Sequence, residues 1–181
     1  MKTTLPKIGS LVEQQVVRLR FIVIIVSLAF CGFYKVTKAV SPAPDGGYPR
    51  GNTANGAFAL LHSGDGKSNT AVGFGALENN NGAAPYASAN TAIGAGALSN
   101  NTDGFANNAV GRGALASNTA GSANQAIGFG ALFHNDYGRQ NVAIGDSSMA
   151  NNVSGFYNTV IGDRAGPFLV AGNGNVYLFI Q

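Results

Sequence analysis

The chain has 181 residues, of which 45% are hydrophobic and only 10% are charged, with 26 glycines, one cysteine and no tryptophan. A typical soluble domain is about 25% charged, so this composition argues against an ordinary enzyme. All 20 asparagines follow residue 51. Because Asn and Gly favour turns over the interiors of strands and helices, the chain is expected to turn often.

The positive charge of the chain is concentrated at its beginning. Six of the eleven basic residues lie within residues 1–38, whereas residues 51–181 contain four basic and six acidic residues, a net charge of −2. Nucleic-acid binding requires clustered lysine or arginine side chains. We therefore expect no nucleic-acid partner for the body of the chain.

Residues 1–39 have the composition of a targeting segment. Two arginines precede an apolar run at residues 21–33, which as a helix would span about 20 Å, less than the ~30 Å hydrocarbon core of a bilayer. This pattern predicts a signal peptide, and the alternative is an uncleaved anchor helix that contacts a membrane only through residues 21–33. Cleavage would remove Cys31 and leave no thiol. The protein is expected to be exported, and secreted or held at the cell surface or outer membrane. Residues 40–51, rich in Pro and Gly, are expected to be a linker.

A repeated motif, Asn-x-Ala-[Val/Ile]-Gly, follows this linker. Successive copies begin 17 residues apart, except for one step of 21 residues that contains Pro85 and Tyr86. The leading asparagines are Asn52, Asn69, Asn90, Asn107, Asn124, Asn141, Asn158 and Asn175. The Val/Ile positions are Val72, Ile93, Val110, Ile127, Ile144 and Ile161, and the glycines that follow them are Gly73, Gly94, Gly111, Gly128, Gly145 and Gly162. Leucine or methionine recurs eight residues after the leading Asn, and a second asparagine recurs eleven residues after it.

The period predicts an all-β fold. Seventeen residues are too few for a helical hairpin, but they can hold two short strands of four or five residues and two turns. Stacking such units gives a parallel β-solenoid of seven or eight coils. We expect the coils to occupy residues 52–166, with residues 167–181 forming a terminal coil or a cap strand.

The alternation of side chains within the motif divides them between two faces. We expect the Val/Ile and Leu positions to fill the coil interior, and the alanines to form a flat outer face against which another chain packs. The stacked asparagines are expected to bond amide to amide. The glycines are expected to supply bends that a Cβ would obstruct.

The repeats Asn90–Gly94 and Asn141–Gly145 resemble the head repeats of trimeric autotransporter adhesins, and related repeats occur in phage tail-fibre-like proteins. The resemblance covers about residues 52–180. It implies a left-handed parallel β-roll, association of three identical chains and a role in adhesion. The sequence shows neither a heptad stalk nor a barrel anchor, so we expect a secreted or N-terminally tethered head, or a truncated one.

Motifs that carry chemistry are scarce. The segment Gly64–Ser68 lacks the first glycine of a phosphate-binding loop. His62 and His134 occupy non-equivalent repeat positions, which argues against a metal site. Asp146 and Asp163 share a repeat position, but the glycine pattern of calcium-binding rolls is missing. We expect no catalytic residue, cofactor or metal, and thus no enzyme.

Exposed aromatic and arginine side chains are the usual anchors of recognition. We call residues at the same position of successive repeats a column. The candidate ligand-contact residues are Phe74, Arg112 and Phe129 in one column, Phe105, Arg139 and Phe156 in another, and Tyr86 on the insertion. The alternative is that these aromatic side chains pack between chains or coils. The expected function is surface attachment or cell adhesion as a homotrimer that binds a host protein, a matrix protein or a glycan. The alternative function is a structural fibre or envelope segment without a specific ligand.

Overall fold

The computed structural model describes residues 49–83 and 86–179. The expected targeting segment and all but the last residues of the expected linker lie outside these ranges. The described residues form a short 3₁₀-helix and eight strands of three residues each. These are η1 (Pro49–Gly51), β1 (Thr53–Asn55), β2 (Thr70–Val72), β3 (Thr91–Ile93), β4 (Asn108–Val110), β5 (Gln125–Ile127), β6 (Val142–Ile144), β7 (Thr159–Ile161) and β8 (Val176–Leu178). Among the described residues, none belongs to a helix with the length and hydropathy that crossing a membrane requires.

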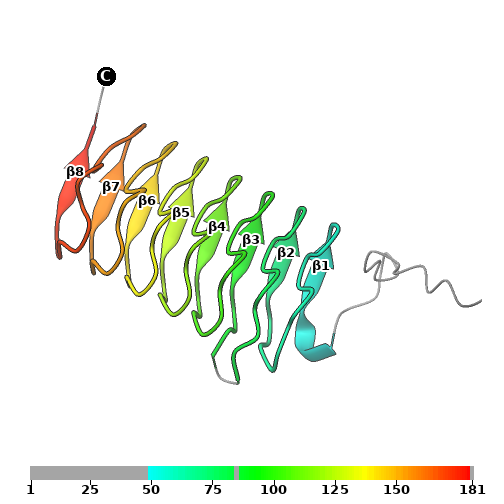
Figure 1. Cartoon of the computed structure of the whole chain (residues 1–181). Helices are drawn as coiled ribbons and strands as arrows, with labels where there is room; N and C mark the ends of the chain where they lie inside the picture. The colour runs from blue at the N-terminus through cyan, green and yellow to red at the C-terminus, as the bar shows by residue number, and fades with distance from the viewer. Residues whose placement is uncertain (1–48, 84–85, 180–181) are drawn as a thin grey trace, which may run out of the picture. The chain divides into compact units, whose positions relative to one another are not determined.

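The eight strands lie side by side in chain order in one parallel sheet (Figure 1). Each strand residue pairs with its equivalent in the next copy of the motif, as Ala109 does with Ala126. The four-residue insertion leaves this register unchanged, because Ala71 pairs with Ala92. The described residues therefore form a parallel β-solenoid of about seven turns, as the repeat predicts.

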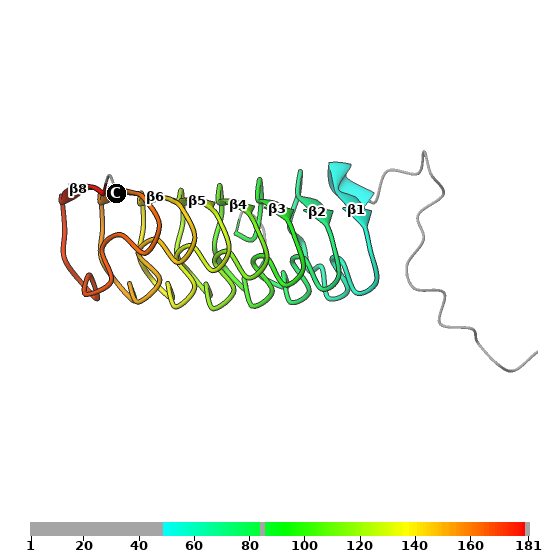
Figure 2. The same cartoon turned by 90° about the horizontal axis from the view of Figure 1, so that it is seen from above.

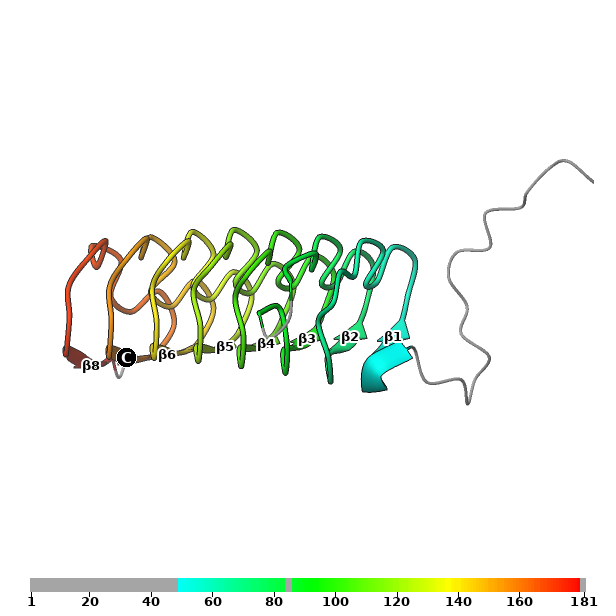
Figure 3. The same ribbon diagram turned by 90° about the horizontal axis from the view of Figure 1, so that it is seen from below.

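Each coil contains one strand, whereas two strands of four or five residues were expected from its length. The strands form a single row, and the turns that connect them form the rest of each coil (Figures 2 and 3). The glycine after each Val/Ile position ends the strand. Gly73 has a φ of 129°, and a Cβ there would lie 2.7 Å from the carbonyl carbon of Gly94 in the next coil.

The two faces of the sheet are the reverse of the expectation. The motif alanines point into the coil, and Ala126 is 0% exposed, while the adjacent Ile127 is 40% exposed. The alternation itself is present, as the burial pattern of β5 shows. The reversal has a steric cause. The interior of a 17-residue coil is narrow, and the strand alanines share it with a second set of buried alanines, each one residue before a buried leucine, such as Ala131. The expectation that alanines form the outer face is wrong.

The leucine column completes the apolar interior, as expected. Leu77, Leu98, Leu115 and Leu132 are fully buried, and Met149 continues the column. These residues have a left-handed backbone, with φ values such as 51° for Leu98. That conformation costs about 1–2 kcal/mol for a residue with a Cβ, and burial of the leucine side chain, worth about 1.5–3 kcal/mol, offsets it.

Two columns of buried asparagine form the polar part of the interior. In the first column, the backbone amide and side-chain amide of Asn124 both donate to Oδ1 of Asn107, at 3.0 and 3.1 Å. In the second column, Nδ2 of Asn135 donates to Oδ1 of Asn118 at 2.8 Å. The carbonyl oxygen of Gly138 joins the columns, since it accepts from Asn124 at 2.8 Å and from Asn135 at 3.1 Å. Buried amides are thus satisfied from coil to coil.

Candidate functional site

The outer face of the sheet carries an apolar stripe along the stacked coils. We call it the Val/Ile stripe; it consists of Val72, Ile93, Val110, Ile127, Ile144 and Ile161. All of these side chains are exposed except that of Val110, which is half-buried. Parallel pairing places each member next to its equivalent in the neighbouring strand. Such a continuous apolar surface is typical of an interface with another chain.

A second surface lies at the bend that follows the strands. The guanidinium carbon of Arg112 lies 5.7 Å from the centre of the Phe129 ring, within the range of a cation–π interaction. The backbone amide of Phe129 donates to Oδ1 of Asp146 at 2.9 Å. We call these three residues the Phe129 corner. It presents a cation, a ring that is 52% exposed and a carboxylate on three successive coils.

The remaining members of that column do not join the Phe129 corner. Phe74 is exposed and packs edge-to-face against Phe58, with ring centres 5.2 Å apart. Asp163 is exposed and continues the column beyond Asp146. The column therefore has one aromatic residue, Phe74, towards the N-terminal end, where it pairs with Phe58 from the adjacent repeat position, and carboxylates towards the C-terminal end.

The other predicted column lies on the opposite side of the strands, where the chain approaches the next leading asparagine. Phe105 and Phe156 are exposed there, and Arg139 forms an isolated parallel bridge with Phe156. The backbone amide of Phe105 donates to Oγ of Ser122 at 3.2 Å. Tyr86 is also exposed, on the insertion. The sequence thus identifies surface residues, but they belong to separate surfaces.

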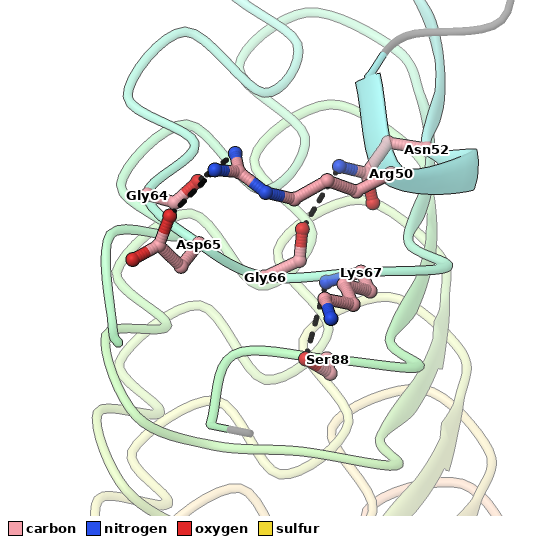
Figure 4. A network of polar contacts seen from close by, with 7 residues as sticks. All are labelled: Arg50, Asn52, Gly64, Asp65, Gly66, Lys67 and Ser88. Carbon is pink, nitrogen blue, oxygen red and sulfur yellow. Dashed lines mark hydrogen bonds and ion pairs between the residues drawn. The ribbon is translucent and has the colours of Figure 1, made fainter. Parts of the chain in front are cut away.

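The segment Gly64–Ser68 is engaged in contacts at the N-terminal end of the stack (Figure 4). The Arg50 guanidinium donates to the carbonyl oxygen of Gly64 at 3.3 Å and to Oδ1 of Asp65 at 2.7 Å. Nδ2 of Asn52 donates to the carbonyl oxygen of Gly66 at 3.0 Å, and the Lys67 amide donates to Oγ of Ser88 at 3.1 Å. These contacts bind the segment to neighbouring coils.

The C-terminal end of the stack has an apolar surface. A recess of about 530 Å³ is lined there by residues that include Phe168, Leu169, Tyr177 and Phe179. Residues of β8 pair with β7 in register, and their side chains are exposed. Phe168 is 92% exposed.

The sequence also failed to identify a polar recess formed by three successive coils, which contains His134 and Asp136. Its signal in the sequence is that Ser117, His134 and Asn151 share one repeat position, and that Thr119, Asp136 and Val153 share another. Among residues 49–83 and 86–179, no three His, Cys, Asp or Glu side chains are grouped so that they would hold a metal ion.

The chain matches no family model, no curated protein and no solved structure. Its candidate sites are therefore the surfaces described above, and each is defined by the geometry of its own residues.

Proposed function

We propose that this chain is an exported, non-enzymatic attachment module that works as a homotrimer of adhesin-like heads. The proposal combines the resemblance of the repeats to trimeric autotransporter heads with the parallel β-solenoid. We also propose that the coil is left-handed, that residues 1–39 direct export, and that the protein lies outside the cell or at its surface.

The exposure of the Val/Ile stripe is the observation that carries the proposal. Five of its six members are 36–42% exposed, on a face whose other positions are partly polar, such as Thr91 and Gln125. Full burial of such a side chain contributes about 1.5–3 kcal/mol. Because the stripe residues are already more than half buried within one chain, association along the stripe would add only the remaining part of this gain, but it would do so at every coil. The interface we propose therefore consists of Val and Ile side chains and not of alanines.

The Phe129 corner is the surface that we propose for a matrix-protein or glycan ligand. It joins an arginine with a large exposed phenylalanine ring, two residue types that are enriched in protein interfaces. The Asp146 carboxylate holds the Phe129 backbone from the next coil. The ring is therefore presented by a fixed backbone, which lowers the entropic cost of binding.

Binding of the full chain to immobilised matrix proteins and glycans tests the proposal. Arg112→Ala and Phe129→Ala are each expected to weaken attachment by about tenfold or more, the loss typical of an interface anchor. Phe168→Ala is the control, since it removes an exposed ring at the C-terminal end of the stack. Unchanged binding by both corner variants would exclude the Phe129 corner as the ligand site.

A structural fibre or envelope segment is the alternative function. The hydrogen bonds from coil to coil favour it, because they form along the stack without needing a ligand. Under this alternative, electron microscopy would show fibre-like particles of the full chain, and no matrix protein or glycan would bind. Saturable binding that depends on Arg112 would contradict it.

A further inference from the structure

The polar recess lies on the connections between strands, away from both the Val/Ile stripe and the Phe129 corner. It is shallow and wide open to solvent, with a volume of about 480 Å³. Three successive coils supply its walls. The lining residues are Ser117, Thr119, His134, Asp136, Asn151 and Val153.

The second asparagine column explains why these residues come together. Asn118, Asn135 and Asn152 are buried, and each is flanked in sequence by two residues of the recess. The flanking side chains are half-buried or exposed. Stacking the coils therefore places three such pairs above one another on the surface.

Asp136 is held rigidly in this recess. Its carbonyl oxygen accepts the backbone amides of Thr119, Ala120 and Gly121 at 3.2, 3.1 and 2.9 Å. The hydroxyl of Thr119 donates to its Oδ1. Within the described residues, no donor reaches Oδ2, so one oxygen of a fixed carboxylate is left to accept a hydrogen bond from a ligand.

Asn151 supplies a second acceptor that a hydrogen bond holds, whereas His134 is positioned only by a ring contact. Nδ2 of Asn151 donates to the carbonyl oxygen of Pro167 at 2.8 Å, which leaves its Oδ1 as an acceptor. The imidazole of His134 packs edge-to-face against the Phe133 ring, with ring centres 4.8 Å apart. No hydrogen bond to that imidazole forms within the described part of the chain.

Two acceptors that hydrogen bonds hold, Asp136 and Asn151, call for a ligand with several donors, and the His134 imidazole can add either a donor or an acceptor. Sugar hydroxyl groups supply such donors, and the exposed side chain of Val153 offers an apolar contact for the C–H face of a sugar ring. A divalent cation is less suited, because the described residues contain no group of three His, Cys, Asp or Glu ligands. We propose that this recess binds a neutral saccharide unit, with Asp136 as its main hydrogen-bond acceptor.

This site is separate from the Phe129 corner. It rests on the proposed function in one respect, namely that the protein is exported and therefore meets glycans outside the cell. Because the recess shares no residue with the Val/Ile stripe, the proposed homotrimer would present three copies of it. Multivalent presentation raises the avidity for a branched or surface-bound glycan without any new contact.

The test is to apply the full chain to an array of neutral oligosaccharides and to measure the best binder by titration calorimetry. Asp136→Asn is expected to weaken binding by about tenfold or more, the loss of a hydrogen bond to a charged group. Val153→Trp is expected to abolish binding by filling the recess. Asp163→Asn is the matched control, because Asp163 is an exposed carboxylate outside the recess.

Thermal melts of each variant show whether it folds. If Asp136→Asn does not fold, Val153→Trp decides the question, because its side chain lies at the surface. Full-strength binding by Val153→Trp, loss of binding on adding a chelator, or an array without any neutral saccharide bound would each overturn the proposal. Attachment to a matrix protein through Arg112 and Phe129 would survive each of these outcomes, so a failure of the saccharide site can be distinguished from a failure of the Phe129 corner.

Discussion

The guanidinium group of Arg50 donates a hydrogen bond to the carbonyl oxygen of Gly64 at 3.3 Å. The equivalent carbonyl oxygen in later coils, such as that of Asp136, accepts three backbone amides from the preceding coil. The side chain of Arg50 thus takes the place of a missing coil at the N-terminal end of the described stack. Its ion pair with Asp65 adds a second contact at the same end.

We expect Arg50→Ala to loosen the first coil. The ion pair is partly exposed, with Arg50 at 45% and Asp65 at 59%, so the loss is expected to be about 0.5–1 kcal/mol. Amide hydrogen exchange should rise in β1 and remain unchanged in β5. Lys67→Ala is the control, since the Lys67 side chain forms no ion pair within the described residues. Equal exchange in β1 of both variants would contradict the capping role.

Asn124→Ala is expected to lower the free energy of unfolding by about 3 kcal/mol. It removes the donor to Gly138 and the acceptor for both amides of Asn141, and buried groups left without partners cost about 1–3 kcal/mol each. Urea denaturation measures the change. Asn108→Ala, on the outer face of β4, should change stability by less than about 0.5 kcal/mol, and an equal loss in both variants would show that the ladder has no special role.

Gly73→Ala is expected to cost at least about 3 kcal/mol. The new Cβ would lie 2.7 Å from the Gly94 carbonyl carbon, at a φ of 129° that residues with a Cβ rarely adopt. Gly96→Ala is the matched control, because Gly96 has a φ of 68° and a Cβ added there would meet no atom within 4 Å. That variant should lose only about 1–2 kcal/mol. Similar melting temperatures for the two variants would contradict the close approach of successive coils.

The narrow interior can be tested within one strand. Ala126→Ile places three extra carbons in the packed interior and is expected to destabilise the fold by about 3 kcal/mol. Gln125→Ile adds a similar apolar side chain on the outer face of β5, where the existing side chain is half-buried. Its expected effect is within about 0.5 kcal/mol. The reverse order of the two effects would restore the alternative in which alanines face outward.

The repeat predicts the stacking, because equivalent residues of successive coils lie next to one another when the coils are stacked. Asn107 and Asn124 share a column, and the structure joins them directly. The sequence could not show which face is inside. Hydrophobicity alone would place Ile127 in the interior, because isoleucine is more hydrophobic than alanine. The coil is too narrow for the isoleucine side chain, so Ala126 occupies the interior and Ile127 the outer face. Strand length depended on Gly73, whose positive φ ends the strand after three residues.

The surfaces were predicted less completely than the fold. Arg112 and Phe129 were selected as neighbours in one column, and the guanidinium and the ring lie close enough to interact. The polar recess could not be found in the same way. The 17-residue step already stacks Ser117, His134 and Asn151 on one another. It does not show that the Asn135 side chain turns inward, which leaves a recess between the side chains that flank it.

The most direct test of the proposed function is the mass of the full chain in solution, measured by light scattering during size-exclusion chromatography. We predict the mass of three chains, and the mass of one chain for a variant carrying both Ile127→Asp and Ile144→Asp in the Val/Ile stripe. The matched control is Phe105→Asp, an exposed site outside the stripe, which should remain trimeric. A single-chain mass for the unaltered protein, or a trimer that persists in the double variant, would contradict the proposed assembly.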